Sequence, residues 1–240
     1  QEAEKSTPDA ELFQGESPWP EIRKKRINTL LPEALKAAKV DGWMLIAREN
    51  NNDPLADHVG AENAGGTAAF LFYNDSHGFH SVVFSPSGES TALDELNIHD
   101  EVIPVERGAS AIEQAMEFIR KNSLRKLAIN TSENNSLADG LSYTQRMELD
   151  KLNKGNEIDF VSSEDVVYEW LSIKLPEEVE IMKKAAKLTG EVESEGYQQI
   201  IPGTTIDADV ARFLTKKMAE AGVKDGWSPN KNPNVNSGPD

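Results

Sequence analysis

The 240-residue sequence contains no cysteine. A disulfide framework, a thiolate zinc site and a cysteine nucleophile are therefore excluded. No apolar run approaches the roughly 20 residues needed to cross a bilayer, so we expect no membrane span. Positive charge is also in the minority, since the sequence has 25 Lys and Arg and 41 Asp and Glu, for a net charge of −16. Such a surface repels nucleic acid and anionic membranes, and neither is expected as a partner.

Residues 1–17 form a polar tail with almost no periodic apolar content. The first residue is Gln1 rather than methionine, and we interpret the tail as one exposed after removal of a signal peptide. This interpretation predicts export to a periplasm or the extracellular space, with a cytoplasmic protein as the alternative.

Residues 18–165 alternate between the helical period and the strand period. The 22–38 segment predicts two helices separated at Pro32, and 43–47 predicts a strand. A polar loop, 48–66, then leads to a hairpin of two β-rich runs, 67–73 and 80–85. Strands are expected at 101–105, 126–130 and 158–162, and helices at 109–122 and 141–152. This order predicts an α/β domain with a largely parallel or mixed sheet flanked by helices.

Residues 166–240 have a different character. The 176–200 segment is amphipathic at helical spacing, and a second helix is expected over 205–221, capped by Thr204 or Thr205 and ended by Gly222. Two such helices in succession need a further layer to cover them, so we predict an incomplete second domain. The last nine residues, NPNVNSGPD, favour a loop that approaches a binding site.

Two phrases in this second part are distinctive, and their key positions are Ile173-Lys174, Glu180-Ile181, Ala185-Ala186, Pro202-Gly203, Val210 and Gly222. They resemble the phrase that opens the catalytic pita-bread α+β domain of the creatinase/prolidase/Xaa-Pro aminopeptidase family and the phrase that forms the second helix of that domain. Residues 18–170 resemble the creatinase-like N-terminal domain of the same family. The resemblance implies a creatinase-like domain followed by the first helices of a pita-bread domain.

This resemblance implies a metallopeptidase that hydrolyses the peptide bond before a proline in second position and acts as a homodimer. Similar enzymes bind two divalent ions (Mn, Co or Zn) through two aspartates, a histidine and two glutamates, and a bridging water attacks the carbonyl. We expect all five ligands after Asp240 and none in this chain. The alternatives are a non-catalytic peptide-binding or dimerisation module of the same fold and a creatine-hydrolysing enzyme.

The loop after the first strand, RENNND, supplies the candidate substrate-binding residues Arg48, Asn51 and Asp53. The resemblance implies that this loop reaches the catalytic groove of the dimer mate, where Arg48 would meet a substrate carboxylate by paired, charge-assisted hydrogen bonds. Asn51 and Asp53 are secondary candidates. The alternative interpretation is an exposed arginine at a strand end.

The remaining polar residues favour structural interpretations. His58 and Glu62 have the spacing of two ligands on one helical face, but two ligands do not make a metal site. His77 and His80 belong to a predicted hairpin turn, and His99 is expected to be solvated. Other patterns that carry no predicted chemistry are the acidic pairs Glu177-Glu178, Glu191-Glu193 and Asp207-Asp209, the glycines Gly60, Gly65 and Gly66, and the serines Ser142 and Ser237.

Overall fold

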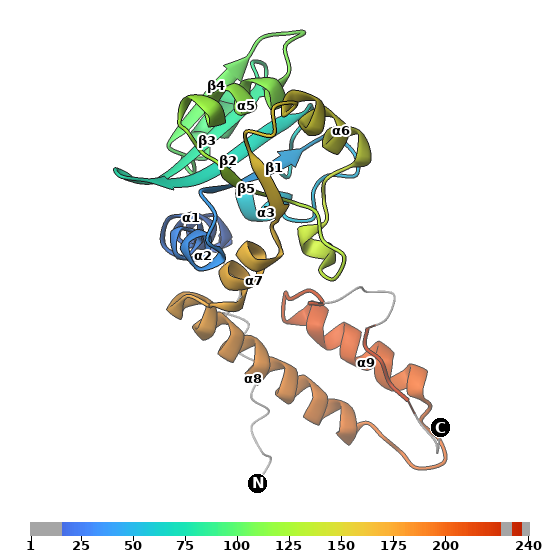
Figure 1. Cartoon of the computed structure of the whole chain (residues 1–240). Helices are drawn as coiled ribbons and strands as arrows, with labels where there is room; N and C mark the ends of the chain where they lie inside the picture. The colour runs from blue at the N-terminus through green and yellow to red at the C-terminus, as the bar shows by residue number, and fades with distance from the viewer. Residues whose placement is uncertain (1–15, 227–231, 237–240) are drawn as a thin grey trace. The chain divides into compact units, whose positions relative to one another are not determined.

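The computed structural model describes residues 16–226 and 232–236. It contains two compact units, one formed by Trp19–Lys174 and another that includes Leu175–Asp240, and each is described here by itself (Figure 1). Most of the predicted polar tail, 1–17, and the end of the NPNVNSGPD segment, including Ser237, lie outside the described residues. None of the described helices is both long enough and apolar enough to span a membrane.

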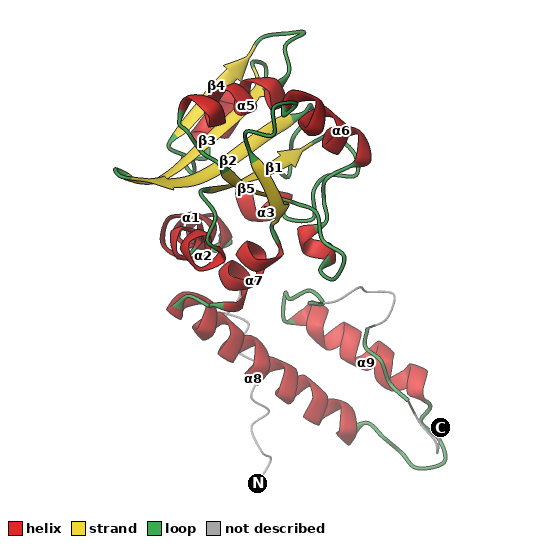
Figure 2. Ribbon diagram, in the orientation of Figure 1, coloured by secondary structure: helices red, strands yellow, loops and turns green. Residues whose placement is uncertain are grey.

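A six-stranded mixed sheet forms the centre of the first unit (Figure 2). In spatial order its strands are β4 (Glu101–Val105), β3 (Gly78–Pro86), β2 (Ala68–Asp75), β1 (Gly42–Ala47), β5 (Lys126–Ile129) and β6 (Asp159–Ser162). Only β2 runs against its neighbours β1 and β3, while the other adjacent pairs are parallel. Five strands therefore end at the same edge of the sheet. The predicted mixed sheet and the predicted β2–β3 hairpin are confirmed.

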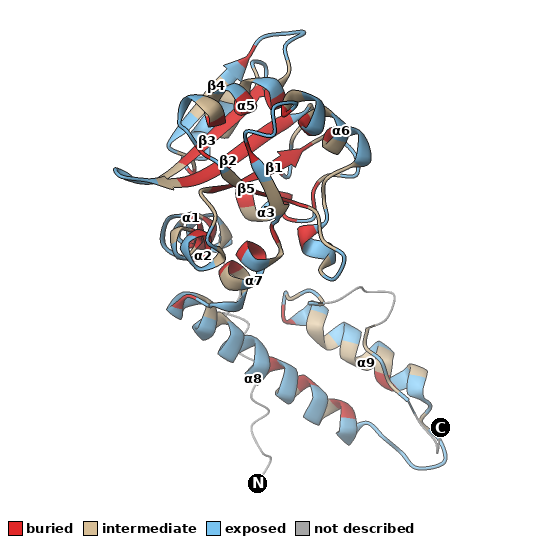
Figure 3. Cartoon of the chain, viewed as in Figure 1, coloured by how far each residue is buried: buried red, intermediate tan, exposed pale blue. Residues whose placement is uncertain are grey.

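Helices cover both faces of this sheet, and alternation along the strands divides the core between them (Figure 3). Trp43 and Leu45 of β1 face a cluster made by α1 (Trp19–Thr29), α2 (Leu31–Ala38) and α7 (Glu164–Ser172). Met44 and Ile46 face a cluster made by α5 (Ala111–Lys121) and α6 (Tyr143–Leu152). Because both of its faces are covered, β1 is buried along its whole length.

Three short helical segments lie in stretches for which the sequence pattern predicts neither a helix nor a strand. They are α3 (Ala56–Val59), α4 (Ser90–Glu95) and the 3₁₀ turn η2 (Ser136–Ala138). The predicted polar loop 48–66 is therefore partly wrong, since α3 contributes the buried side chains of Ala56 and Val59 to the core.

The first unit continues to Lys174 and includes α7. The reason is the fully buried side chain of Trp170 on α7. Its indole Nε1 donates to the carbonyl of Arg26 at 3.2 Å, and the buried Arg26 guanidinium donates back to the carbonyls of Trp170 and Ile173. Helix α7 is thus part of the α/β unit.

The second unit contains the two predicted helices, α8 (Pro176–Gln198) and α9 (Asp207–Glu220). They pack through Leu188, Val192 and Ala221, and an ion pair of 2.8 Å joins Lys217 to Glu195. That these helices open a pita-bread domain stays a prediction.

The start of each of these helices is held by an acidic side chain from its first turn. Glu178 accepts from the Leu175 amide at 2.8 Å, and Asp209 accepts from the Ile206 amide at 3.2 Å. The predicted capping by Thr204 or Thr205 is therefore wrong, and Thr205 Oγ1 instead accepts from the Ile201 amide. Gly222, at φ 71°, ends α9 as predicted.

Candidate functional site

The carboxyl ends of β1, β5 and β6 bring a set of polar side chains to one edge of the sheet. Arg48, Asn130 and Ser163 each follow the last residue of one of these three parallel neighbours. In open α/β sheets ligands bind outside the carboxyl ends of the strands, particularly where the strand order reverses. After β1 the chain continues to β2, which lies on one side of β1, whereas β5 lies on the other side. The loop after β1 therefore lies at such a point.

Arg48 is half-buried, and two acceptors fix its guanidinium group. Its Nε donates to the carbonyl of Asn51 at 2.8 Å, and its Nη1 donates to Oε1 of Gln145 on α6 at 3.1 Å. The loop turns back on itself because Asn50 and Asn51 both adopt left-handed backbone angles, with φ of 54° and 50°. The structure therefore brings Arg48 and Asn51 together, but through the backbone carbonyl of Asn51 rather than its exposed side chain.

Asp53 lies inside the domain, where the residue is 4% exposed. Its Oδ1 accepts from the Leu55 amide at 2.9 Å, and its Oδ2 accepts from Asn130 Nδ2 at 2.8 Å. Asn130 Oδ1 in turn accepts from Trp43 Nε1 and Ser163 Oγ, both at 2.7 Å. Burial raises the pKa of the Asp53 carboxyl above its ordinary value, and the two hydrogen bonds oppose that rise. This geometry does not fit direct substrate contact by Asp53, which anchors the loop instead.

Gln145 is a residue of this site that the sequence analysis missed. It occupies the third position of α6, where its Oε1 accepts from the amide of the N-cap residue Ser142 at 2.9 Å, and its own amide donates to Ser142 Oγ. This is a capping box, whose Ser-x-x-Gln signature is readable in the sequence. The contact of Gln145 with Arg48, 97 residues away along the chain, cannot be read from the sequence.

His58 and Glu62 are not arranged as a pair of metal ligands. Glu62 forms an ion pair of 2.9 Å with the buried Arg23, and the His58 ring lies edge-on to the rings of Trp19 and Trp170. Over residues 16–226 and 232–236, no group of three His, Asp or Glu side chains is placed to hold a metal ion.

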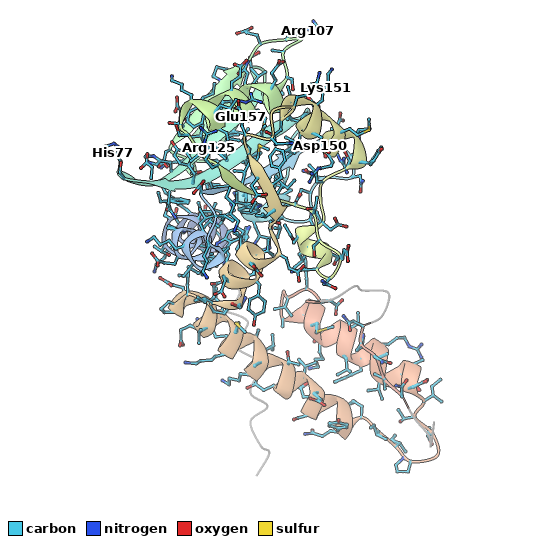
Figure 4. All side chains as sticks on the ribbon, in the orientation of Figure 1. His77, Arg107, Arg125, Asp150, Lys151 and Glu157 are labelled. Atoms are coloured by element: carbon cyan, nitrogen blue, oxygen red, sulfur yellow. The ribbon has the colours of Figure 1, made fainter. Side chains whose placement is uncertain are left out.

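His77 and His80 lie in the β2–β3 hairpin, as predicted, with His77 at its tip (Figure 4). His80 Nε2 contacts Asp75 Oδ1 at 2.9 Å, and its ring stacks on Tyr73 at 4.8 Å. The hydrogen bond from the His77 amide and, to a smaller extent, the hydrogen bond with the His80 side chain lower the pKa of the Asp75 carboxyl. These contacts make the pair part of the hairpin structure.

His99 is half-buried and both of its ring nitrogens make hydrogen bonds, so the prediction of a solvated residue is wrong. Its Nε2 lies 2.9 Å from the carbonyl of Val59, and its Nδ1 lies 2.6 Å from Ser81 Oγ. The neutral ring satisfies both contacts when Nε2 donates and Nδ1 accepts. Burial, with a smaller effect from Arg23, lowers the pKa of His99 to about 4. His99 therefore ties α3 to the sheet in its neutral form.

A cavity of about 530 Å³ lies at the same edge of the sheet, beyond the ends of β3 and β4. Arg107 and Gly108 of the β4–α5 loop line it, together with Ser110 at the start of α5. Ser110 Oγ donates to Glu148 of α6 at 2.8 Å, which closes one wall. The polar groups of that wall thus bond to each other.

Solved structures with a similar fold include an X-Pro aminopeptidase, a dipeptidase and a putative aminopeptidase P. No family model and no curated protein matches the sequence. The solved structures that are similar include the X-Pro aminopeptidase from Thermotoga maritima, with a TM-score of 0.51, 17% identity, and coverage of 79% of this chain and 49% of that chain. The dipeptidase PepE from Mycobacterium ulcerans has a TM-score of 0.55, 15% identity, and coverage of 82% and 50%.

A putative aminopeptidase P from Bacillus anthracis is similar to the same degree, with a TM-score of 0.55, 12% identity, and coverage of 88% of this chain and 53% of that chain. At these identities the likeness is one of fold. It confirms the predicted α/β fold, and it confirms the predicted family resemblance as a resemblance of fold. The chain spans about half the length of each of these three solved structures.

Proposed function

We propose that this chain is the N-terminal α/β domain, followed by the first helices of the catalytic domain, of a metallopeptidase that cleaves before a proline in second position. The observation that carries the proposal is the extent of the fold match. Each of the three matches covers at least 79% of the chain, whereas Trp19–Lys174 makes up only about two thirds of it. The likeness therefore continues past Lys174 into the segment where the family-like phrases lie.

The metal chemistry in this proposal belongs to residues beyond Asp240. Paired Mn, Co or Zn ions would supply a metal-activated water that is nucleophilic near neutral pH. The described residues of this chain offer no group of three ligands, so no catalytic step is assigned to them.

The contribution of this chain is to substrate binding within a proposed homodimer. Arg48 presents a guanidinium group at the carboxyl edge of the sheet, and the Asp53–Asn130 network beneath it holds the loop in place. The peptide substrate, with its free carboxylate, matches a guanidinium in charge and geometry. Export of the protein is also retained as a proposal, which cell fractionation would test.

The test uses the full-length protein that contains this chain. Gly-Pro, Gly-Ala and creatine are each offered with Mn²⁺, Co²⁺ or Zn²⁺ and again after chelation, and the released products are measured. We expect metal-dependent hydrolysis of Gly-Pro in preference to Gly-Ala. Hydrolysis of creatine alone would assign the protein to a different reaction, and peptide binding without hydrolysis under any metal would favour the non-catalytic module.

A further inference from the structure

The sheet of the first unit ends in β4 on one side and in β6 on the other. We infer that the outer edge of β6 pairs with β6 of a second copy of this chain, antiparallel and about a two-fold axis. This contact joins the two six-stranded sheets into one. The inference does not depend on the proposed peptidase activity.

The outer edge of β6 presents backbone donors and acceptors. On the inner edge, the Asp159 amide donates to the carbonyl of Arg125 at 2.7 Å, and the Ser163 amide donates to the carbonyl of Ile129 at 2.9 Å. Backbone groups alternate in direction along a strand, so the N–H and C=O groups of Phe160 and Ser162 face away from β5. Within residues 16–226 and 232–236, these outward groups have no strand beside them, because β6 is the last strand of the sheet.

The opposite edge of the sheet is blocked. The Ser87 amide donates to the carbonyl of Val105 at 3.0 Å, so Val105 and Ile103 face β3 while Pro104 faces outward. Proline has no N–H to donate, and an outward-facing proline is one of the ways in which proteins prevent pairing at a sheet edge. Neither outward-facing residue of β6 is a proline or carries a charge, so this protection is confined to β4.

The side chains of β6 hold the strand in place without crossing its edge, because they point to the two faces of the sheet. Phe160 is half-buried against the cluster of α5 and α6, with the Arg146 guanidinium 5.6 Å from the centre of its ring. Val161 is half-buried on the other face, against the cluster of α1, α2 and α7. A strand that is already ordered loses less conformational freedom when it pairs.

A second copy fits this edge because β6 is complementary to itself. A two-fold axis between the two Val161 residues places Phe160 of each copy opposite Ser162 of the other. Each of these two pairs exchanges two backbone hydrogen bonds, about four in total, and the Val161 side chains meet as the central non-hydrogen-bonded pair. Such a contact uses the same surface on both copies, so it closes with two chains.

Charge is compatible with this register. Asp159 is the only charged residue of β6, and it falls opposite Ser163 of the second copy rather than opposite another carboxylate. Like charges directly opposite each other would destabilise the pairing. The net charge of −16 on each chain opposes association at long range, but this repulsion is screened beyond about 8 Å at 0.15 M salt.

The test is disulfide trapping in the full-length protein that contains this chain. Residues 1–240 contain no cysteine, and the wild type measures the background from any cysteine elsewhere. Val161→Cys places one thiol at the centre of the contact, where the Cα atoms of a non-hydrogen-bonded pair lie about 4.5 Å apart, within the range that a disulfide requires. Ile103→Cys is the matched control, because it is half-buried at the centre of the blocked strand β4.

A second pair of variants separates backbone pairing from side-chain contact. Ser162→Pro removes the outward N–H of β6, as Pro104 does for β4. Ser162→Ala removes the same hydroxyl, which accepts from the Glu164 amide at 3.1 Å, but it keeps the N–H. Each change is combined with Val161→Cys. The covalent dimer formed with oxidised glutathione at about 0.15 M salt is measured by non-reducing electrophoresis.

We expect Val161→Cys to give at least about tenfold more covalent dimer than Ile103→Cys. Ser162→Pro should lower this yield at least about tenfold, because the two-fold axis makes one missing N–H cost two hydrogen bonds. Ser162→Ala should leave the yield unchanged.

Equal trapping in Val161→Cys and Ile103→Cys would overturn the inference, because it would reflect random collision. No trapping in Val161→Cys would also overturn it and would leave the edge open to a strand of a different protein. Trapping that persists in Ser162→Pro would show that backbone pairing is not its cause. If Ser162→Pro does not fold, the comparison of the two cysteine variants decides alone. None of these measurements uses peptide hydrolysis, so failure of the proposed function is distinguishable from failure of the inference.

Discussion

Gly140 lies directly against the carboxylate of Asp53, so that a Cβ at position 140 would overlap Asp53 Oδ2. The same Cβ would lie 2.7 Å from Cδ of Pro54. Asp53 has no room to yield, because it is buried and both of its oxygens accept hydrogen bonds. The turn before α6 therefore requires glycine for close approach to the loop that carries Arg48.

Gly140→Ala should lower the free energy of unfolding by about 1–3 kcal/mol, the usual cost of forcing extra volume into a packed site. Denaturant titration measures the change. Gly88→Ala is the control, since a Cβ there meets nothing within 4 Å, and its effect should stay within about 0.5 kcal/mol. Equal stability of Gly140→Ala and the wild type would contradict the described packing.

The Asp53–Asn130 pair predicts that an exchange of the two residues is better tolerated than either single change. Asp53→Asn leaves one oxygen for two donors, so the introduced amide nitrogen faces either the Leu55 amide or the Asn130 amide nitrogen, unless Asn130 turns its oxygen away from Trp43 and Ser163. Each of these results leaves a buried polar group unpaired and should cost about 1–3 kcal/mol.

In the double variant Asp53→Asn with Asn130→Asp, donor and acceptor are exchanged. The carboxylate introduced at position 130 accepts from the side-chain amide introduced at position 53 as well as from Trp43 and Ser163, so every hydrogen bond of the network is restored. Denaturant titration of the full double-mutant cycle should give a favourable coupling energy of at least about 1 kcal/mol. Simple additivity of the two single changes would show that the pair does not act as described.

The low pKa of the half-buried His99 predicts a loss of stability in mild acid. The pKa of His99 is about 4 in the folded protein, against an ordinary value of 6.5. Between these values the unfolded chain binds a proton that the folded chain excludes, so the stability due to neutral His99 is complete above pH 6.5 and is lost as the pH falls towards 4. The total is about 3 kcal/mol.

Denaturant titrations between about pH 7 and pH 4, the range in which the neutral ring becomes protonated, test this expectation. His99→Gln removes the titrating group, so its stability should fall less across that range than the stability of the wild type. His80→Gln serves as the control on the hairpin surface and should keep the wild-type loss. A parallel decline in His99→Gln and the wild type would show that another group causes the acid sensitivity.

The features that the sequence predicted well are those set by local pattern. The β2–β3 hairpin follows from two β-rich runs around a turn, and the two helices at 22–38 follow from apolar spacing and from Pro32, which sits in the first turn of α2. The end of α9 at Gly222 likewise depends on one residue that adopts a left-handed backbone angle.

The features that the sequence did not show depend on contacts between distant parts of the chain. Helix α7 belongs to the first unit because Trp170 meets Arg26, 144 residues away. His99 bonds to Val59 and Ser81, 40 and 18 positions earlier in the chain, and Arg48 is fixed by a residue 97 positions later. Asp53, one of the three predicted substrate-binding residues, is buried, and no local sequence pattern indicates that burial.

The proposal that catalysis resides beyond Asp240 is tested most directly by measuring metal content and proline release for two proteins side by side. One is residues 1–240, and the other is the full-length protein, each loaded with Mn²⁺, Co²⁺ or Zn²⁺ and then freed of excess ion. We predict about two ions per chain and proline release from Gly-Pro in the full-length protein, with neither property in residues 1–240, because acid–base groups alone give only about 10²–10⁴-fold acceleration. Proline release by residues 1–240, or none by the metal-loaded full-length protein, would contradict the proposal.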